Sequence, residues 1–486
     1  MRVVALPRRL SVTLDIEAPG TYEPERRYIL DVVFGDWLGL DWRLHLRDGS
    51  DVRITLGGDR GRCVVLPDVL FGTPPTQWLT PSSLPAVPLA WCEVPAIGPS
   101  PLTSRQRLPV LYGTAAPRDA LLVRRPDTIE LSVDVFGSCF FMLSRYEELV
   151  VPTRDLYGRF AGSSSIANRE GFLRLPIVDA YVEVLWMALK QLWPRLKRKP
   201  RHFDIALSHD VDRPLASLGR RIPALVRQLG ADALVRRDPG LVVRRLRSWS
   251  GIRHGDYSLD PYNTFDFLMD VSEQHGIVSA FYFLATEDAT ALDGFYTLGH
   301  PWIESLLRRI HHRGHEIGLH ASFHSYLDPQ RTKEEFVRLR QAAEHQGAFQ
   351  QDWGGRQHYL RWENPFTWAN WDLAGLDYDS TLAYADQIGF RVGTCHEFSA
   401  FHLQERRPLR LRERPLQVMD GTLFEYMKLP PDTAFEAVIA LAGECRRYGG
   451  TLSLLWHNSS LPTARQKRWY ETLVSTVSGH ASNQSS

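Results

Sequence analysis

Strand-like and helix-like segments alternate along the second half of the chain, and this alternation constrains the fold more than any other feature. Strands alternating with helices indicate a parallel sheet covered by helices, either open or closed into a barrel. In such folds, sites are built from polar residues at the carboxyl ends of the strands. The apolar, strand-like runs are 202–210, 279–286, 315–320 and 450–460, and the segments with helical spacing are 263–276, 301–314 and 332–347.

The first part of the chain has a different pattern. It contains short alternating strands, Pro-rich loops and one amphipathic segment over 177–192. The basic stretch "PRLKRKPRH" follows and indicates a domain boundary near residue 200. A chain of 486 residues is long enough for two or three domains. We therefore expect a smaller α+β domain over 1–200, an α/β domain over 201–475 and a disordered tail over 476–486.

Bulk composition excludes several classes of protein. The formal net charge is +1, so no overall field favours nucleic acid. The five cysteines include no CxxC pair, which argues against a disulfide framework or a thiolate zinc site and favours a reducing compartment. The N-terminus lacks the apolar core of a signal peptide, and no uncharged run reaches the ~20 residues of a membrane span. We expect a cytoplasmic protein without a transmembrane segment.

An Arg-rich insertion, residues 213–257, separates the first strand from its following helix. Its apolar residues recur at helical spacing, which predicts one or two amphipathic helices with solvated arginine faces. A lid, a contact for an anionic substrate, or a peripheral contact with a membrane surface is the functional alternative.

Two acids end the first strand, in "ALSHDVDRP". Side chains two residues apart in a strand point to the same face, so Asp210 and Asp212 can converge while His209 points away. The alternative is a strand-to-loop turn that uses Asp as a turn former.

Histidines follow two later strands. His320 and His324 lie four residues apart in "GHEIGLHASFHSY", a spacing that stacks two imidazoles on one helical face and suits a metal. Two imidazoles and one carboxylate make a three-ligand set that leaves a position for water. His457 closes the apolar strand of "LLWHNSS" and can donate a proton at the same rim. Taken singly, each histidine can equally be a surface or strand-end residue.

Together, "ALSHDVDRP", "HEIGLHASFHSY" and "LLWHNS" resemble the first, second and last motifs of the NodB-homology polysaccharide deacetylases, carbohydrate esterase family four. The resemblance covers roughly residues 203–460 by motif order. It implies a distorted (β/α) barrel, a divalent metal held by one Asp and two His, and hydrolysis of an N-acetyl group on a saccharide. The stretch "FGSCFFMLSRYEE" resembles a companion domain of some of these proteins, for which we know of no activity.

The resemblance assigns roles to the residues of the three motifs. His320 and His324 match the metal histidines, and His457 matches the general acid. By order, Asp210 is the general base and Asp212 the third metal ligand. The family has adjacent acids where Val211 separates them here, so the two acids could exchange roles.

The middle motifs of the family, including R-x-P-Y, are not present as such. "YLRWENPFTW" offers Arg361 as the arginine that orients the base, and Arg391 is an alternative. Asp386 is a candidate partner of the catalytic histidine. Leu455 lies where the family places a leucine against the acetyl methyl group. Trp362 could stack on a sugar or pack in the core.

The leading hypothesis is a metal-dependent hydrolase that removes an N-acetyl group from a polysaccharide or a glycan intermediate, in exopolysaccharide biosynthesis. A bound Zn²⁺ lowers the pKa of its water to near 7, and Co²⁺, Mn²⁺ or Fe²⁺ also suit such ligands. Two alternatives stay open: an O-deacetylase or other amide hydrolase with the same metal site, and a non-catalytic glycan-binding or scaffold protein of an assembly system.

Overall fold

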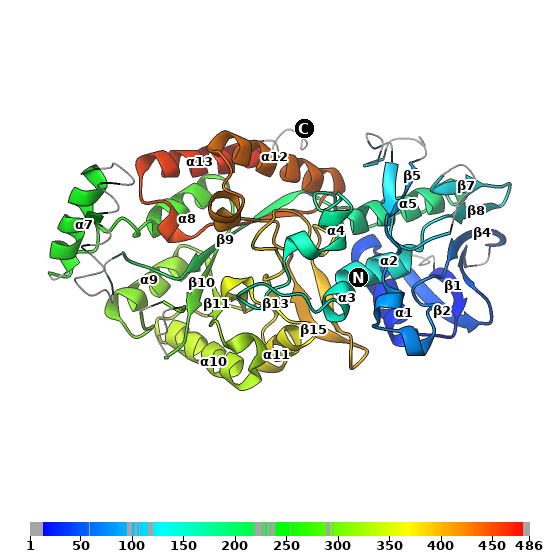
Figure 1. The fold of residues 1–486 in the computed structure, drawn as a ribbon, viewed down its shortest axis with the longest axis horizontal. Helices are drawn as coiled ribbons and strands as arrows, with labels where there is room; N and C mark the ends of the chain where they lie inside the picture. The colour runs from blue at the N-terminus through cyan, green and yellow to red at the C-terminus, as the bar shows by residue number, and fades with distance from the viewer. Residues whose placement is uncertain are drawn as a thin grey trace, which may run out of the picture. The chain divides into compact units, whose positions relative to one another are not determined.

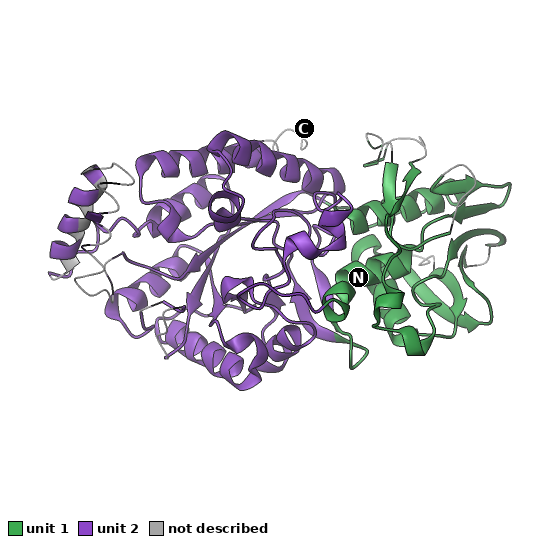
Figure 2. Cartoon of the chain, in the orientation of Figure 1, with its two compact units in different colours: residues 1–151, 176–201, 401–408 green, residues 152–175, 202–400, 409–486 purple. Residues whose placement is uncertain are grey.

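The chain divides into two compact units. The computed structural model describes residues 13–479, apart from 58, 95–99, 103–104, 106, 115–119, 217, 219–225, 227–228, 231–233, 235–238, 253, 288–291 and 295. Unit 1 comprises residues 1–151, 176–201 and 401–408, and unit 2 comprises 152–175, 202–400 and 409–486 (Figure 2). The chain passes between the units near residue 200, where a boundary was expected, but 152–175 and 401–408 depart from a simple division at that point.

Unit 1 is built on a six-stranded sheet with the order β2-β1-β3-β4-β8-β7. Helix α5 has buried residues along nearly its whole length, including Ile177, Tyr181, Val184 and Leu192 of the expected apolar stripe. The strands are β1 (Thr13–Pro19), β2 (Asp41–Arg47), β3 (Asp51–Leu56), β4 (Asp59–Pro67), β7 (Leu122–Arg124) and β8 (Thr128–Leu131), with a separate pair β5 (Ala90–Glu93) and β6 (Arg107–Val110). The helices are α1 (Glu23–Leu30), α2 (Val135–Leu143), α3 (Tyr146–Val150) and α5 (Ile177–Leu192).

Unit 2 contains a nine-stranded sheet that curls into a half-barrel (Figure 1). Its order is β14-β15-β13-β12-β11-β10-β9-β17-β16, and the pairs from β15 to β16 are parallel. The expected α/β class is therefore confirmed, and the curled half-barrel is consistent with the predicted distorted barrel. The strands are β9 (Asp204–Val211), β10 (Ala280–Leu284), β11 (Glu316–Ala321), β12 (Gly354–Gln357), β13 (Tyr378–Asp379), β14 (Phe398–His402), β15 (Arg407–Glu413), β16 (Val418–Met419) and β17 (Thr451–Leu455).

Helices connect most of the parallel strands. Helix α9 has proline at its first position and buries Ile303, Leu306, Leu307 and Ile310 at helical spacing. Helix α10 begins earlier than the expected residue 332, because the Asp328 carboxylate accepts the N–H of Arg331 and caps it. The helices of unit 2 are α4 (Ile166–Arg169), α7 (Pro239–Ile252), α8 (Phe265–Gln274), α9 (Pro301–His312), α10 (Pro329–His345), α11 (Phe366–Ala374), α12 (Pro431–Tyr448) and α13 (Ala464–Gly479).

A glycine brings two central strands of the half-barrel together. A Cβ atom at Gly355 of β12 would overlap the carbonyl oxygen of Leu319 on β11. Only glycine fits at so close a backbone approach. The residues that follow Gly355 are thereby held next to the end of β11.

Two expectations fall partly outside the described residues. Helix α7 lies within the Arg-rich insertion, but much of 213–238 is not described. The membrane contact expected of this insertion stays a prediction. Helix α13 continues through Gly479, so the expected tail does not begin at 476, and residues 480–486 lie outside the described part. None of the described helices is long and apolar enough to cross a membrane.

Candidate functional site

Polar side chains from five strands of the half-barrel meet at one rim. Each lies within the last residues of its parallel strand or just after it, where α/β folds place their sites. They line a cavity of about 350 Å³. The contributors are Asp210 on β9, Asp212 after β9, His320 on β11, His358 after β12, Asp420 after β16 and His457 after β17.

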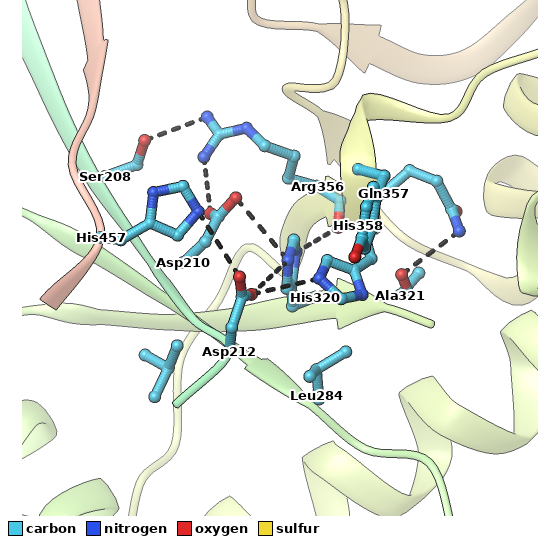
Figure 3. A network of polar contacts seen from close by, with 12 residues as sticks. Ser208, Asp210, Asp212, Leu284, His320, Ala321, Arg356, Gln357, His358 and His457 are labelled. Carbon is cyan, nitrogen blue, oxygen red and sulfur yellow. Dashed lines mark hydrogen bonds and ion pairs between the residues drawn. The ribbon is translucent and has the colours of Figure 1, made fainter. Parts of the chain in front are cut away.

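Asp212, His320 and His358 form the centre of this site (Figure 3). The Asp212 Oδ1 atom lies 3.1 Å from His320 Nε2 and 3.4 Å from His358 Nε2. One possible ligand atom from each of the three residues lies within 4.8 Å of the other two. Both histidines are almost fully buried, whereas Asp212 keeps about a quarter of its side chain exposed, at 27%.

The hydrogen bonds of the two imidazoles suit a cation at this centre. His320 Nδ1 lies 3.0 Å from the carbonyl oxygen of Arg356, which can only accept, so Nδ1 carries the proton. His358 Nδ1 likewise faces the Asp293 carboxylate at 3.1 Å. In the neutral rings both Nε2 atoms are then acceptors, directed at a carboxylate oxygen that is itself an acceptor.

Three converging acceptors repel one another unless protons or a cation lie between them. His320 Nε2 and Asp212 Oδ1 are both buried and make no hydrogen bond. A metal ion satisfies all three atoms, and an outer partner on each Nδ1 is the usual support of a metal-binding histidine. The residues present therefore fit a divalent metal with one carboxylate and two imidazole ligands.

Without a metal, protons would take its place. Burial opposes a charge on His358, but the carboxylates of Asp212 and Asp293 raise the pKa of His358 to about 9. Burial also works against a charge on Asp212, yet the charge of His358 and bonds from the two histidines hold the pKa of Asp212 well below its usual range. The site thus favours positive charge beside an ionised carboxylate.

Asp210 lies next to this centre and is held by an arginine. Its Oδ2 is 3.7 Å from His320 Nε2, and its Oδ1 accepts a hydrogen bond of 2.8 Å from Arg356. The Arg356 guanidinium is fully buried and also donates to the hydroxyl of Ser208 and to Ser380. A charge-assisted bond to a buried guanidinium fixes the orientation of the Asp210 carboxylate.

His457 lies beside this centre, and each of its ring nitrogens faces a carboxylate. His457 Nε2 lies 3.6 Å from Asp212 Oδ2, and its Nδ1 lies 2.7 Å from Asp420 Oδ1. Burial opposes a charge on the ring, but the carboxylates of Asp420, Asp212 and Asp210 raise the pKa of His457 to about 10. These carboxylates therefore favour the imidazolium form of His457, whose Nε2 lies toward the cavity.

His209 and His324 lie away from the centre. His209 is fully buried with Nδ1 2.8 Å from the carbonyl oxygen of Trp456, in agreement with the expectation that it points away. His324 is exposed on the turn after β11, where its neighbour Phe323 is the buried residue. The structure does not bring His324 to Asp212 and His320, and His358 occupies the place expected for it.

Arg361 and Asp386 also differ from their expected places. Arg361 lies between the rings of Phe323 and Tyr326, 3.9 and 3.8 Å from their centroids, while Arg356 is the arginine that bonds Asp210. The Asp386 carboxylate accepts the backbone N–H groups of Gly162 and Ser163 at 2.7 and 3.1 Å.

Three further expected residues are core residues. Leu455 is fully buried in a cluster whose members Leu360 and Met419 line the cavity. Trp362 is 1% exposed and packs edge to face on Trp368, so no sugar can stack on it. Arg391 is buried and donates to the carbonyl oxygen of Ala383 at 2.8 Å.

Sequence reasoning missed Arg356, His358, Asp293 and Asp420. A signal for the first two exists, because Arg356-Gln357-His358-Tyr359 has the spacing of R-x-P-Y with His in place of Pro. Asp293 and Asp420 lie in or next to loops and carry no comparable pattern.

Comparisons with known proteins find one family model and several solved structures. Residues 14–194 match a family of unknown function, DUF7033. No curated protein matches the chain. Among solved structures, a protein of Mycobacterium smegmatis assigned as a polysaccharide deacetylase is 17% identical, with a TM-score of 0.36 over 59% of this chain and 92% of its own.

Two further structures resemble the chain. One is the Xyl-CE4 domain of a multidomain xylanase from the hindgut metagenome of Trinervitermes trinervoides, 11% identical, with a TM-score of 0.29 over 59% of this chain and 85% of that domain. The other is a mutant of a CE4-family pseudoenzyme, 9% identical, with a TM-score of 0.29 over 58% of this chain and 64% of its own. Likenesses at these scores do not identify an activity.

Proposed function

We propose that the protein is a metal-dependent hydrolase that removes an N-acetyl group from a saccharide. One observation carries the proposal: a carboxylate, Asp210, and an imidazole, His457, both adjoin the group of Asp212, His320 and His358 in one cavity. Amide hydrolysis needs a base for water and an acid for the departing nitrogen, and this cavity offers both. The three motifs that resemble the NodB-homology deacetylases support the same reaction.

Asp212, His320 and His358 would hold the metal. The Arg356 carbonyl oxygen would fix the imidazole of His320, and Asp293 that of His358. Each accepts a hydrogen bond from the Nδ1–H of its histidine. When bound there, a divalent cation such as Zn²⁺ acidifies water and stabilises negative charge on a carbonyl oxygen.

Asp210 is the proposed general base. Its bond to Arg356 fixes the carboxylate and leaves Oδ2 directed toward the centre. From there it accepts a proton from the attacking water. The two acids on one strand face thus have separate proposed roles. Asp212 is a metal ligand and Asp210 is the general base, as the motif order predicts.

His457 is the proposed general acid. Asp420 accepts a hydrogen bond from Nδ1–H of His457, which fixes the ring with Nε2–H toward the cavity. From Nε2 the imidazolium donates its proton to the sugar nitrogen as the carbon–nitrogen bond breaks. Because Leu455 is buried, Leu360 and Met419 are the apolar residues placed to meet the acetyl methyl group.

The test is a stoichiometric assay on the full chain loaded with Zn²⁺. Oligomers of N-acetylhexosamine are incubated with the protein, and released acetate and new primary amine are both quantified. We expect equal amounts of the two products from wild type, loss of both in Asp210→Asn, and retention of both in His324→Ala.

Other outcomes would replace the proposal. Acetate from O-acetylated saccharides without any new amine would make the protein an esterase with the same site. Saccharide binding by calorimetry without any released acetate would favour the non-catalytic alternative.

A further inference from the structure

One segment of the pocket wall comes from the region that matches the family of unknown function. Residues 152–175 belong to unit 2, although they lie between α3 and α5 of unit 1 in the sequence (Figure 2, purple). They also fall within the matched residues 14–194. A part of this match therefore lies in the same compact unit as the proposed active site.

Polar contacts at three points fix this segment to the half-barrel. Arg154 forms a two-bond ion pair with Glu363, at 3.0 and 2.9 Å. The backbone of Gly162 donates to Asp386 at 2.7 Å, and the carbonyl of Leu173 accepts from the N–H of Phe390 at 2.9 Å. The role of Asp386 is therefore to hold this segment.

Arg159 lies where the segment reaches the cavity. The side chain is 5% exposed, and it lines the cavity together with Tyr359 and Tyr426. Its guanidinium donates to the Asp155 carboxylate at 2.8 Å, to the carbonyl oxygen of Tyr359 at 3.0 Å and to the hydroxyl of Tyr426 at 3.2 Å. It also stacks over the Tyr426 ring, 5.4 Å from the centroid. One side chain thus fixes two tyrosines of the cavity wall.

The backbone that Arg159 holds is strained. Tyr359 and Leu360 have φ values of +60° and +55°, a left-handed conformation that bulky residues rarely adopt. Such a conformation costs of order 1–3 kcal/mol and persists only where its surroundings impose it. Tyr359 directly follows His358, so the bond from Arg159 supports the turn that presents both the imidazole and the tyrosine to the cavity.

We propose that residues 152–175 are part of the substrate-binding pocket, with Arg159 as a positioning residue that holds Tyr359 and Tyr426 as the wall against which the sugar binds. The inference rests on the proposed deacetylase function. Tyrosine supplies an apolar ring face and a polar hydroxyl, which together suit a saccharide. The matched region of unknown function thereby contributes a specificity element to the active site.

The experiment compares Arg159→Ala and Arg159→Lys with Arg154→Ala in the full, Zn²⁺-loaded chain. Arg154 is the matched control, because it anchors the same segment by an ion pair but does not line the cavity. Two substrates are used: an N-acetylhexosamine oligomer, which needs the wall, and 4-nitrophenyl acetate, which has no sugar. Bound zinc and the melting temperature are measured for each variant.

We expect Arg159→Ala to lose about tenfold or more in kcat/KM for the oligomer, mainly through KM, with zinc content and ester hydrolysis within about twofold of wild type. Arg159→Lys should recover part of the loss, because an ammonium group can bond the Tyr359 carbonyl but not hold both tyrosines. Arg154→Ala should keep kcat/KM within about twofold.

Oligomer kinetics of Arg159→Ala that match wild type, or that fall no further than those of Arg154→Ala, would overturn this inference and leave the proposed function intact. A wild-type protein that releases no acetate from any saccharide would overturn the proposed function and this inference with it.

Discussion

His358 Nε2 lies 3.4 Å from Asp212 Oδ1, and this pairing across two strand ends defines the candidate metal centre. The exposed His324, which has the more familiar spacing from His320, does not take part. We therefore expect substitution of His358, but not of His324, to weaken metal binding.

His358→Ala should weaken Zn²⁺ binding by more than the roughly 10- to 100-fold that loss of an outer partner of a metal ligand costs. His324→Ala should leave the affinity within about twofold. Competition titration against a zinc chelator measures both. The assignment of His358 is wrong if the two variants show the reverse order.

Asp210 and Asp212 should separate catalysis from metal binding. Asp210→Asn keeps the shape but cannot accept a proton, so kcat should fall by about 10²- to 10⁴-fold with full zinc content. Asp212→Asn should lose zinc, because it removes the only carboxylate of the group. Zinc content by mass spectrometry, measured beside acetate release, distinguishes the two. Equal zinc in both variants would contradict the assignment of Asp212.

The residues that the sequence predicted lie at the ends of long apolar strands, whereas two of those it missed lie at the end of a short one. Asp210 lies at the end of β9, Asp212 follows β9 and His457 follows β17. The apolar runs of both strands indicate a strand and its end. Arg356 lies in β12 and His358 follows it. Strand β12 is only "GGRQ" and has no apolar alternation, so the sequence does not reveal a strand there. A short strand built for close backbone approach lacks the pattern that would predict it.

Spacing alone misplaced the second imidazole for a physical reason. A spacing of four positions, as from His320 to His324, brings two rings together only on a helical turn. Here His320 is still in β11, and the chain turns so that Phe323 is buried against Arg361 and His324 faces solvent. His358 and Asp420 reach the site through the order of the strands, which local spacing does not encode.

The His457–Asp420 pair should set the alkaline limit of activity. Asp420 accepts from His457 Nδ1 at 2.7 Å and is the nearest cause of the raised pKa of His457, about 10. The general acid is active only as imidazolium, so kcat should fall at alkaline pH as His457 loses its proton. In Asp420→Asn this fall should begin at a pH lower by about one unit or more, and the pH profile of kcat from 6 to 10.5 measures it. An unchanged alkaline limb would exclude His457 as the titrating acid.

The same pair should stabilise the fold in a pH-dependent way. An unfolded histidine has a pKa near 6.5, so a folded pKa raised to about 10 adds stability that is complete below pH 6.5 and disappears as pH rises through 10. The difference in unfolding free energy between wild type and Asp420→Asn, measured with urea on metal-free protein, should therefore be largest below pH 6.5. A difference that stays constant up to pH 10.5 would show that the ion pair is not its source.

A second pair of carboxyl groups should also make stability decline as pH rises, over a more acidic range. Asp379 on β13 and Glu413 on β15 are register partners, and both are fully buried. Burial raises the pKa of Asp379 to about 6 and that of Glu413 well above its usual range, so the folded state retains protons that the unfolded state loses. Stability from this pair is therefore present below about pH 4 and declines as pH rises toward 6.

Asp379→Asn removes the contribution of Asp379 to that decline, because the amide oxygen can still accept from Thr381 and carries no charge to bury. We expect its melting temperature at pH 8 to exceed that of wild type by about 2–4 °C, with the gain vanishing near pH 4. Asp372→Asn is the control: Asp372 also accepts two backbone N–H groups, those of Arg410 and Leu411, but it has no acid as register partner and should give no gain. Calorimetric scans at the two pH values measure both variants, and a gain for Asp379→Asn of equal size at pH 4 and pH 8 would show that relief of packing, and not of buried charge, is responsible.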